Sequence, residues 1–97
     1  MQFIDPALDA YCESHSSKEP AYLKVLREET YAEIYMPKMC SGHLQGRFLS
    51  LLSHLVRPKV IVEIGTYTGY SALCLAEGLA PGGMVHTIDI DPHLPPF

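Results

Sequence analysis

The sequence lacks the cysteine and histidine patterns that mark disulfide and zinc proteins. Its three cysteines, Cys12, Cys40 and Cys74, lie far apart, and no C-x-x-C pair occurs. The five histidines do not stand at the spacing of zinc ligands. Scattered thiols of this kind are typical of reduced cysteines in the cytosol, so we expect neither a disulfide framework nor a metal site built from these residues.

Concentrated basic charge and long apolar runs are also missing. Seven Lys and Arg residues are spread along a chain of net charge −4, whereas a nucleic-acid binder carries a basic face that neutralises phosphates. The N-terminus has no basic stretch followed by an apolar core, as a signal peptide would. No apolar run approaches the ~20 residues that a membrane span requires. We expect a cytoplasmic protein with no nucleic-acid or membrane partner.

What the chain does contain is the composition of one small globular domain. Of its 97 residues, 47% are apolar and 19% are charged. Its first half predicts three helices, at about 6–14, 19–35 and 43–56. Asp5-Pro6 is a favourable start for the first. The apolar stripes of the other two are formed by Leu23, Leu26, Thr30 and Ile34, and by Leu44, Phe48, Leu51 and Leu55.

The second half changes period and predicts a βαβ unit. Residues 60–64 form a continuous β-branched run, which is typical of a parallel strand covered on both faces. A glycine turn at 65–69, a helix at 70–79 and a second strand at 84–88 follow. A right-handed crossover is expected between the two strands. We therefore divide the chain into N-terminal helices with a loop, 1–58, and a βαβ unit, 59–97.

The glycine turn and the end of the second strand together predict a nucleoside site. Gly65 would let a ligand approach the backbone closely, and the helix that follows offers free amides and a hydroxyl, Ser71, to an anionic group such as a carboxylate. Asp89 stands where an acid in such a unit accepts hydrogen bonds from ribose hydroxyls. Tyr67 replaces the middle glycine of the dinucleotide fingerprint, which argues against NAD and FAD. A phosphate loop is absent as well.

Three segments in register resemble the O-methyltransferases of the catechol and caffeoyl-CoA type. Residues 62–73 closely resemble the first motif of that family, residues 39–46 look like its loop over the cofactor, and residues 87–92 are similar to its second motif. These are class I S-adenosylmethionine (SAM) enzymes. The resemblance implies an α/β chain with a partial Rossmann-like SAM methyltransferase fold, in which N-terminal helices precede one βαβ unit.

The resemblance also implies which residues bind the cofactor. Ser71 would bind the methionine carboxylate and Asp89 the ribose hydroxyls. Several alternatives remain open: Glu63 could cap a strand end or pair with a lysine, Tyr67 and Tyr70 could be core aromatics, Ser71 could only cap its helix, and Met39 could be packing filler. The full set of cofactor residues that we expect is Met39, Ser41, Glu63, Gly65, Tyr67, Gly69, Ser71 and Asp89.

The residues that would perform the chemistry are not found in these 97 positions. The family's divalent metal, usually magnesium, is held by two Asp and one Asn from later strands, and a basic residue there assists deprotonation. We expect an N-terminal portion of an enzyme that methylates a hydroxyl of a small, phenolic molecule, inactive by itself. We expect the chain either to be partial or to complete its sheet by pairing with another copy of itself. The resemblance also implies a homodimer. The alternative is a non-catalytic module that binds a nucleoside or a protein; an NAD-dependent oxidoreductase would need the missing glycine.

Overall fold

The computed structural model describes residues 4–33 and 42–91 of the chain. Met39 and Ser41, expected in the cofactor loop, lie outside the described residues. The elements follow the order α1 (Pro6–Ser14), α2 (Ala21–Glu33), α3 (His43–Val56), β1 (Val60–Ile64), α4 (Tyr70–Ala76) and β2 (Met84–Ile88).

The first two helices begin where local signals place them. Asp5 caps α1, and its Oδ1 accepts the amide of Ala7 at 2.8 Å. α2 begins two residues later than the expected start at 19, because Pro20 supplies the first carbonyl of the helix and accepts the amides of Leu23 and Lys24. On α2 the buried residues are those of the expected stripe, Leu23, Leu26 and Thr30. The fourth member, Ile34, is not among the described residues.

The packing of α3 differs from the sequence prediction. Its apolar residues Phe48, Leu51 and Leu55 are more than half exposed, and its buried residues are the small ones, Gly46, Ser50 and Ser53. Small side chains let α3 approach α4 closely. Apolar periodicity predicted that the face with Phe48, Leu51 and Leu55 would be buried. The face that packs against α4 is instead the one with small residues, which permits the closest contact between the two helices.

The second half of the chain forms the predicted βαβ unit. β1 and β2 pair in parallel with Val60 opposite Met84 and Ile64 opposite Ile88. α4 ends at Ala76, three residues before the expected end. Just beyond it, Gly78 lies against the backbone of α3, where a Cβ would come within 2.3 Å of the carbonyl carbon of Ser53. The chain then turns back and Ala80 donates its amide to Pro58.

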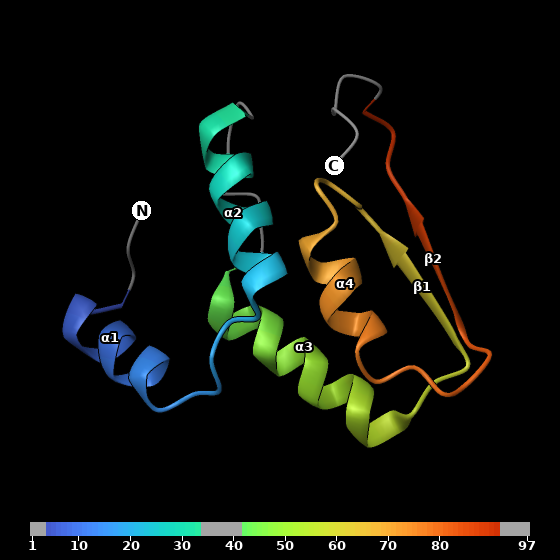
Figure 1. Ribbon diagram of the computed structural model, residues 1–97, viewed down its shortest axis with the longest axis horizontal. Helices are drawn as coiled ribbons and strands as arrows, with labels where there is room; N and C mark the ends of the chain where they lie inside the picture. The colour runs from blue at the N-terminus through green and yellow to red at the C-terminus, as the bar shows by residue number, and fades with distance from the viewer. Residues whose placement is uncertain (1–3, 34–41, 92–97) are drawn as a thin grey trace.

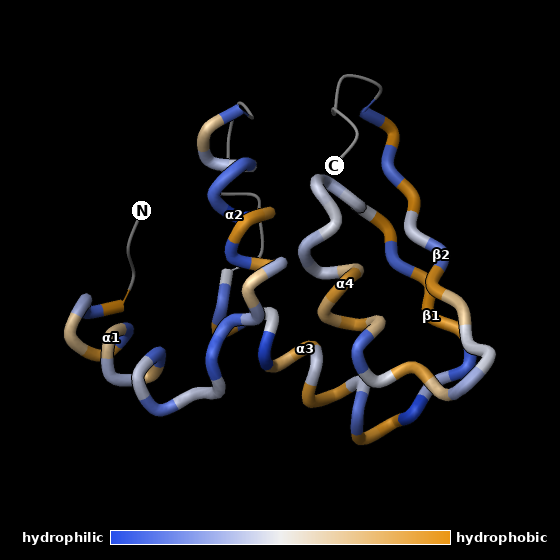
Figure 2. Tube along the Cα trace, in the orientation of Figure 1, coloured by the Kyte–Doolittle hydropathy of each residue, from blue (hydrophilic) through white to orange (hydrophobic). Residues whose placement is uncertain are grey.

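All the helices lie on one side of the two-stranded sheet (Figure 1). Within residues 42–91, alternate strand positions on the opposite face remain exposed, which differs from the expected burial of both faces. Ile64, the most exposed of them, has 88% of its surface accessible. Apolar residues occur along both strands in Figure 2. The exposed sheet face comprises Val60, Val62, Ile64, Met84, His86 and Ile88. In the part of the chain that the structure describes, no helix has the length and apolar character needed to cross a membrane.

Candidate functional site

The turn after β1 has the backbone conformation that its glycines permit. Gly65 has φ +99° and Gly69 has φ +95°, both in the left-handed region that side chains disfavour. The amide of Gly65 donates to the carbonyl of Ile88 at 2.6 Å, which joins the turn to the end of β2. A Cβ built at Gly65 would meet nothing within 4 Å. The backbone at Gly65 is therefore open to close approach by a ligand.

Asp89 lies directly beside this turn. Its Oδ2 accepts the amide of Tyr67 at 2.8 Å, and its Oδ1 accepts the amide of Asp91 at 2.9 Å. These backbone hydrogen bonds lower the pKa of Asp89, that from Tyr67 most. A carboxylate has about four acceptor positions, so two accepted amides leave others for hydroxyl donors. An ionised, exposed acceptor thus stands next to the open backbone of the glycine turn.

Glu63 connects the end of β1 to α4 and β2. Its Oε2 accepts the hydroxyl of Ser71 at 2.5 Å and its Oε1 that of Thr87 at 2.7 Å. The hydroxyl of Thr87 also lies 2.7 Å from that of Thr66. The partners of Glu63 are hydroxyls, in place of the lysine that one alternative invoked. The hydroxyl of Ser71 thus donates to a residue outside its own helix.

Sequence reasoning missed Thr87 as a neighbour of the site. The register pairs Glu63 directly with Thr87, and residues opposite each other in a parallel pair project from the same face. Aligning the two expected strands by their ends could have found this contact. The structure therefore brings together Glu63, Gly65, Tyr67, Ser71 and Asp89 around the turn, with Gly69 at the start of α4.

Tyr70 is a core aromatic, as one of the open alternatives held. It is 2% exposed and belongs to the same buried cluster as Leu23, Leu26 and Cys74. Its hydroxyl donates to Glu19, which lies ahead of α2. Burial, together with this hydrogen bond to a carboxylate, raises the pKa of Tyr70 well above its ordinary value. Tyr70 thus remains protonated and acts as a donor.

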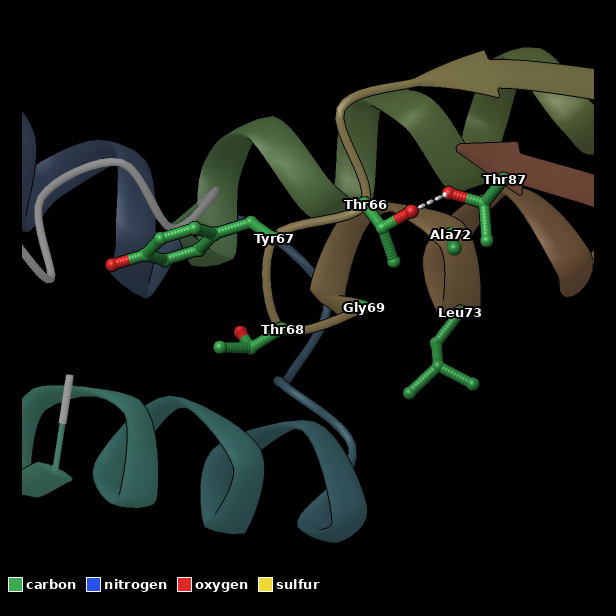
Figure 3. A pocket seen from close by; sticks show the side chains of 7 residues that line it. All are labelled: Thr66, Tyr67, Thr68, Gly69, Ala72, Leu73 and Thr87. Atoms are coloured by element: carbon green, nitrogen blue, oxygen red, sulfur yellow. Dashed lines mark hydrogen bonds between the residues drawn. The ribbon is translucent and has the colours of Figure 1, made fainter. Parts of the chain in front are cut away.

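A hollow of about 320 Å³ opens on one side of the turn (Figure 3). Of the expected cofactor residues that the structure describes, Tyr67 and Gly69 line it. In Figure 3 the ring of Tyr67 extends away from the pair formed by Thr66 and Thr87. Because the hollow does not include Asp89 or Glu63, the hydrogen-bonded cluster locates the candidate site better than the hollow does. The lining residues are Thr66, Tyr67, Thr68, Gly69, Ala72, Leu73 and Thr87.

No group of three His, Cys, Asp or Glu side chains able to hold a metal ion occurs within residues 4–33 and 42–91. The described part of the chain therefore offers no cluster of this kind for the divalent metal that the resemblance implies.

Comparisons with known proteins agree on one family. The family model described as "O-methyltransferase" matches residues 13–95. A catechol O-methyltransferase of Mycobacterium tuberculosis is 34% identical over 88 residues, which are 90% of this chain and 39% of the relative. A caffeoyl-CoA O-methyltransferase of Stellaria longipes is 36% identical over 74 residues, which are 76% of this chain and 30% of the relative.

Among solved structures, the S-adenosylhomocysteine-bound methyltransferase PaMTH1 of Podospora anserina superposes with a TM-score of 0.84 at 30% identity. The match covers 97% of this chain and 44% of that one. The chain thus spans about two fifths or less of the length of the curated relatives described above.

Proposed function

The chain belongs to the O-methyltransferase family, and we propose that it supplies the cofactor-binding N-terminal portion of a SAM-dependent O-methyltransferase. The observation that carries this proposal is the hydrogen bond from the amide of Tyr67 to the carboxylate of Asp89, which joins the glycine turn to the end of β2. We further propose a division into N-terminal helices with the cofactor loop, 1–58, and a βαβ cofactor unit, 59–97.

The proposed cofactor site uses the groups that surround the turn. Asp89 would accept the ribose hydroxyls with the acceptor positions that its two amides leave free. Gly65 would let the methionine part lie against the backbone. Ser71 would bind the methionine carboxylate by turning its single hydroxyl hydrogen from Glu63 to that group. Tyr67 would pack beside the cofactor and Gly69 would allow the entry into α4. Met39 and Ser41 would contact the cofactor from the loop that precedes α3.

In a protein of the length of these relatives, the proposed reaction is in-line transfer of a methyl group from the cofactor sulfonium to a hydroxyl oxygen of a small, phenolic molecule. The names of the relatives, catechol and caffeoyl-CoA O-methyltransferases, support an acceptor of this class. The contribution of this portion is positioning, which can lower the barrier greatly by itself. A magnesium ion, when bound by later segments, would lower the pKa of the acceptor hydroxyl. We expect no turnover from these 97 residues alone.

We also propose that the chain self-associates, as a homodimer or through the open edge of β1. An unpaired apolar strand edge is a template for pairing with another chain, and the exposed sheet face adds apolar area to such a contact. A cytoplasmic location is proposed because Cys12 and Cys74 are free thiols, as is usual in a reducing compartment.

One observation favours a second function, that of a non-catalytic module that binds a nucleoside or a protein. The exposed sheet face, in which Val62 is 65% and Ile64 88% exposed, offers apolar area to a partner. A partner-binding module would not need the carboxylate of Asp89 to bind an adenosyl cofactor, which separates the two functions.

The test is calorimetric titration of the chain with S-adenosylhomocysteine. We expect binding by the unmodified chain and, for Asp89→Ala, affinity lower by about 100-fold, since hydrogen bonds to a charged acceptor are the stronger kind. Asp91→Ala removes the same charge two residues away and should bind nearly as the unmodified chain does. Absence of binding by the unmodified chain, or equal losses in both variants, would favour the second function.

A further inference from the structure

Two hydrogen bonds, one buried and one partly buried, join the region of α2 to the glycine turn. The hydroxyl of Thr30, on α2, and that of Thr68 are hydrogen-bonded at 2.9 Å, and both residues are buried. The hydroxyl of Tyr70 donates to Glu19, just ahead of α2, at 2.5 Å. Thr68 and Tyr70 are the two neighbours of Gly69. The chain is therefore held on both sides of the glycine at which the turn becomes α4.

The acceptor of the second bond is itself fixed in place. Glu19 accepts two hydrogen bonds from the guanidinium of Arg27, at 3.1 and 3.0 Å, and its side chain is only 9% exposed. Arg27 lowers the pKa of Glu19, with partial burial opposing. Glu19 is thus an ionised acceptor at neutral pH, and its position follows that of α2.

The ring of Tyr70 has little freedom on its other side. A Cβ built on Gly46 of α3 would come within 2.8 Å of ring atom Cε1 of Tyr70. The ring is therefore confined between α3 and the segment ahead of α2, and its hydroxyl has a defined direction. A donor and an acceptor that are both held in place form a hydrogen bond with little further loss of side-chain entropy.

Thr68 and Tyr70 are each followed or preceded in the chain by a cofactor residue of the proposed site. Tyr67, whose amide bonds Asp89, precedes Thr68, and Ser71, whose hydroxyl bonds Glu63, follows Tyr70. A displacement of Thr68 or Tyr70 therefore moves, through the backbone, a group that would face the cofactor. Small displacements of such groups carry large costs in binding and reactivity.

We propose that Tyr70, Glu19 and Thr30 are positioning residues that set the conformation of the turn 66–71 before the cofactor binds. The inference rests on the proposed function for its ligand, but it concerns helices outside the βαβ unit. The N-terminal helical region would then serve the cofactor site directly.

The decisive variant is Tyr70→Phe, which removes one hydroxyl and keeps the ring. At a temperature well below unfolding, we expect its affinity for S-adenosylhomocysteine to fall about tenfold. The matched control is Tyr22→Phe. Tyr22, on α2, donates its hydroxyl to Glu77 at the C-terminal end of α4, so this variant also removes a tyrosine-to-glutamate hydrogen bond, but one distant from the glycine turn. A purely structural role would lower the melting temperature of both variants and leave both affinities unchanged.

Amide hydrogen exchange without ligand supplies a second readout. We expect exchange at residues 66–71 to be faster in Tyr70→Phe and in Thr30→Val, and unchanged in Tyr22→Phe and in Thr30→Ser, which keeps the hydroxyl. Unchanged exchange in Tyr70→Phe, or an affinity equal to that of the control, overturns the inference. If the unmodified chain binds no cofactor, the proposed function fails, and the exchange result alone decides whether α2 sets the turn.

Discussion

At the scale of single residues, Glu77 shows how one carboxylate joins three helices. It lies at the end of α4 and accepts hydrogen bonds from Arg47, at 3.0 and 2.7 Å, and from Ser50, at 2.9 Å, both on α3. The hydroxyl of Tyr22 on α2 donates to it as well. The hydrogen bonds from Arg47 lower its pKa from the ordinary value of 4.5, and burial opposes them. The ionised form is therefore the one that stabilises the fold.

A carboxyl with a lowered pKa contributes stability that is complete above its ordinary pKa and disappears as the pH falls through the folded-state pKa. We expect Glu77→Gln to reduce the free energy of unfolding by about 2 kcal/mol at pH 7, and by much less at an acid pH below the lowered folded-state pKa, where the unmodified carboxyl is protonated too. Denaturant titrations at both pH values measure this. Glu13→Gln, at an exposed position of α1, is the control and should change little. An equal loss at both pH values contradicts this account of Glu77.

Sequence reasoning at this scale found the residues that a local motif specifies. Gly65 and Asp89 stand out because a backbone conformation and a strand end each restrict the choice of residue. The bonds from Tyr70 to Glu19 and from Thr30 to Thr68 join residues 51 and 38 positions apart. Such contacts depend on how helices pack, and a single sequence carries no local signal for them.

At the scale of elements, the contact between α3 and α4 depends on the absence of side chains. A Cβ on Gly46 would lie 2.8 Å from the sulfur of Cys74 and 2.8 Å from the ring of Tyr70. Both residues belong to the core, so neither can move away freely.

We therefore expect Gly46→Ala to lower the free energy of unfolding by about 1–3 kcal/mol through overpacking, although alanine favours helix by about 1 kcal/mol over glycine. Thermal or denaturant unfolding measures the difference. Gln45→Ala, at the exposed neighbouring position, should be near neutral. A stabilised Gly46→Ala protein would show that the helices can separate at no cost.

The elements themselves were predicted well, and their packing less so. The bounds of α1, α3 and both strands agree with the sequence, because caps, prolines and the change of period are local signals. The exposed apolar face of α3 was not foreseen. Periodicity indicates that a helix has an apolar side, but the small residues on the other side decided which side meets α4.

At the scale of the whole molecule, the exposed sheet face leaves apolar side chains of both strands in contact with water. If self-association covers it, a charge placed there should oppose the contact. We expect Val62→Lys, at a position 65% exposed on β1, to shift the chain toward monomer at high concentration, as measured by sedimentation velocity. Leu8→Lys, at an exposed position on α1, is the control. A chain that is monomeric without any substitution contradicts the proposed self-association.

The fold class followed from the sequence because a β-branched run, a glycine turn and a second strand leave few topologies for a βαβ unit. The position of all the helices on one side of the sheet did not follow, since a buried parallel strand was expected to be covered on both faces. That expectation describes a whole sheet of several strands, and the two strands here expose one face.

The central claim is that the glycine turn and Asp89 bind one adenosyl ligand together. Two-dimensional NMR of the isotope-labelled chain during titration with S-adenosylhomocysteine tests it most directly. We predict that the amide signals of Gly65, Tyr67 and Asp89 move together with one apparent dissociation constant, while that of Val60 at the far end of β1 stays in place. Movement of only one of the two segments, or of neither, would contradict the claim.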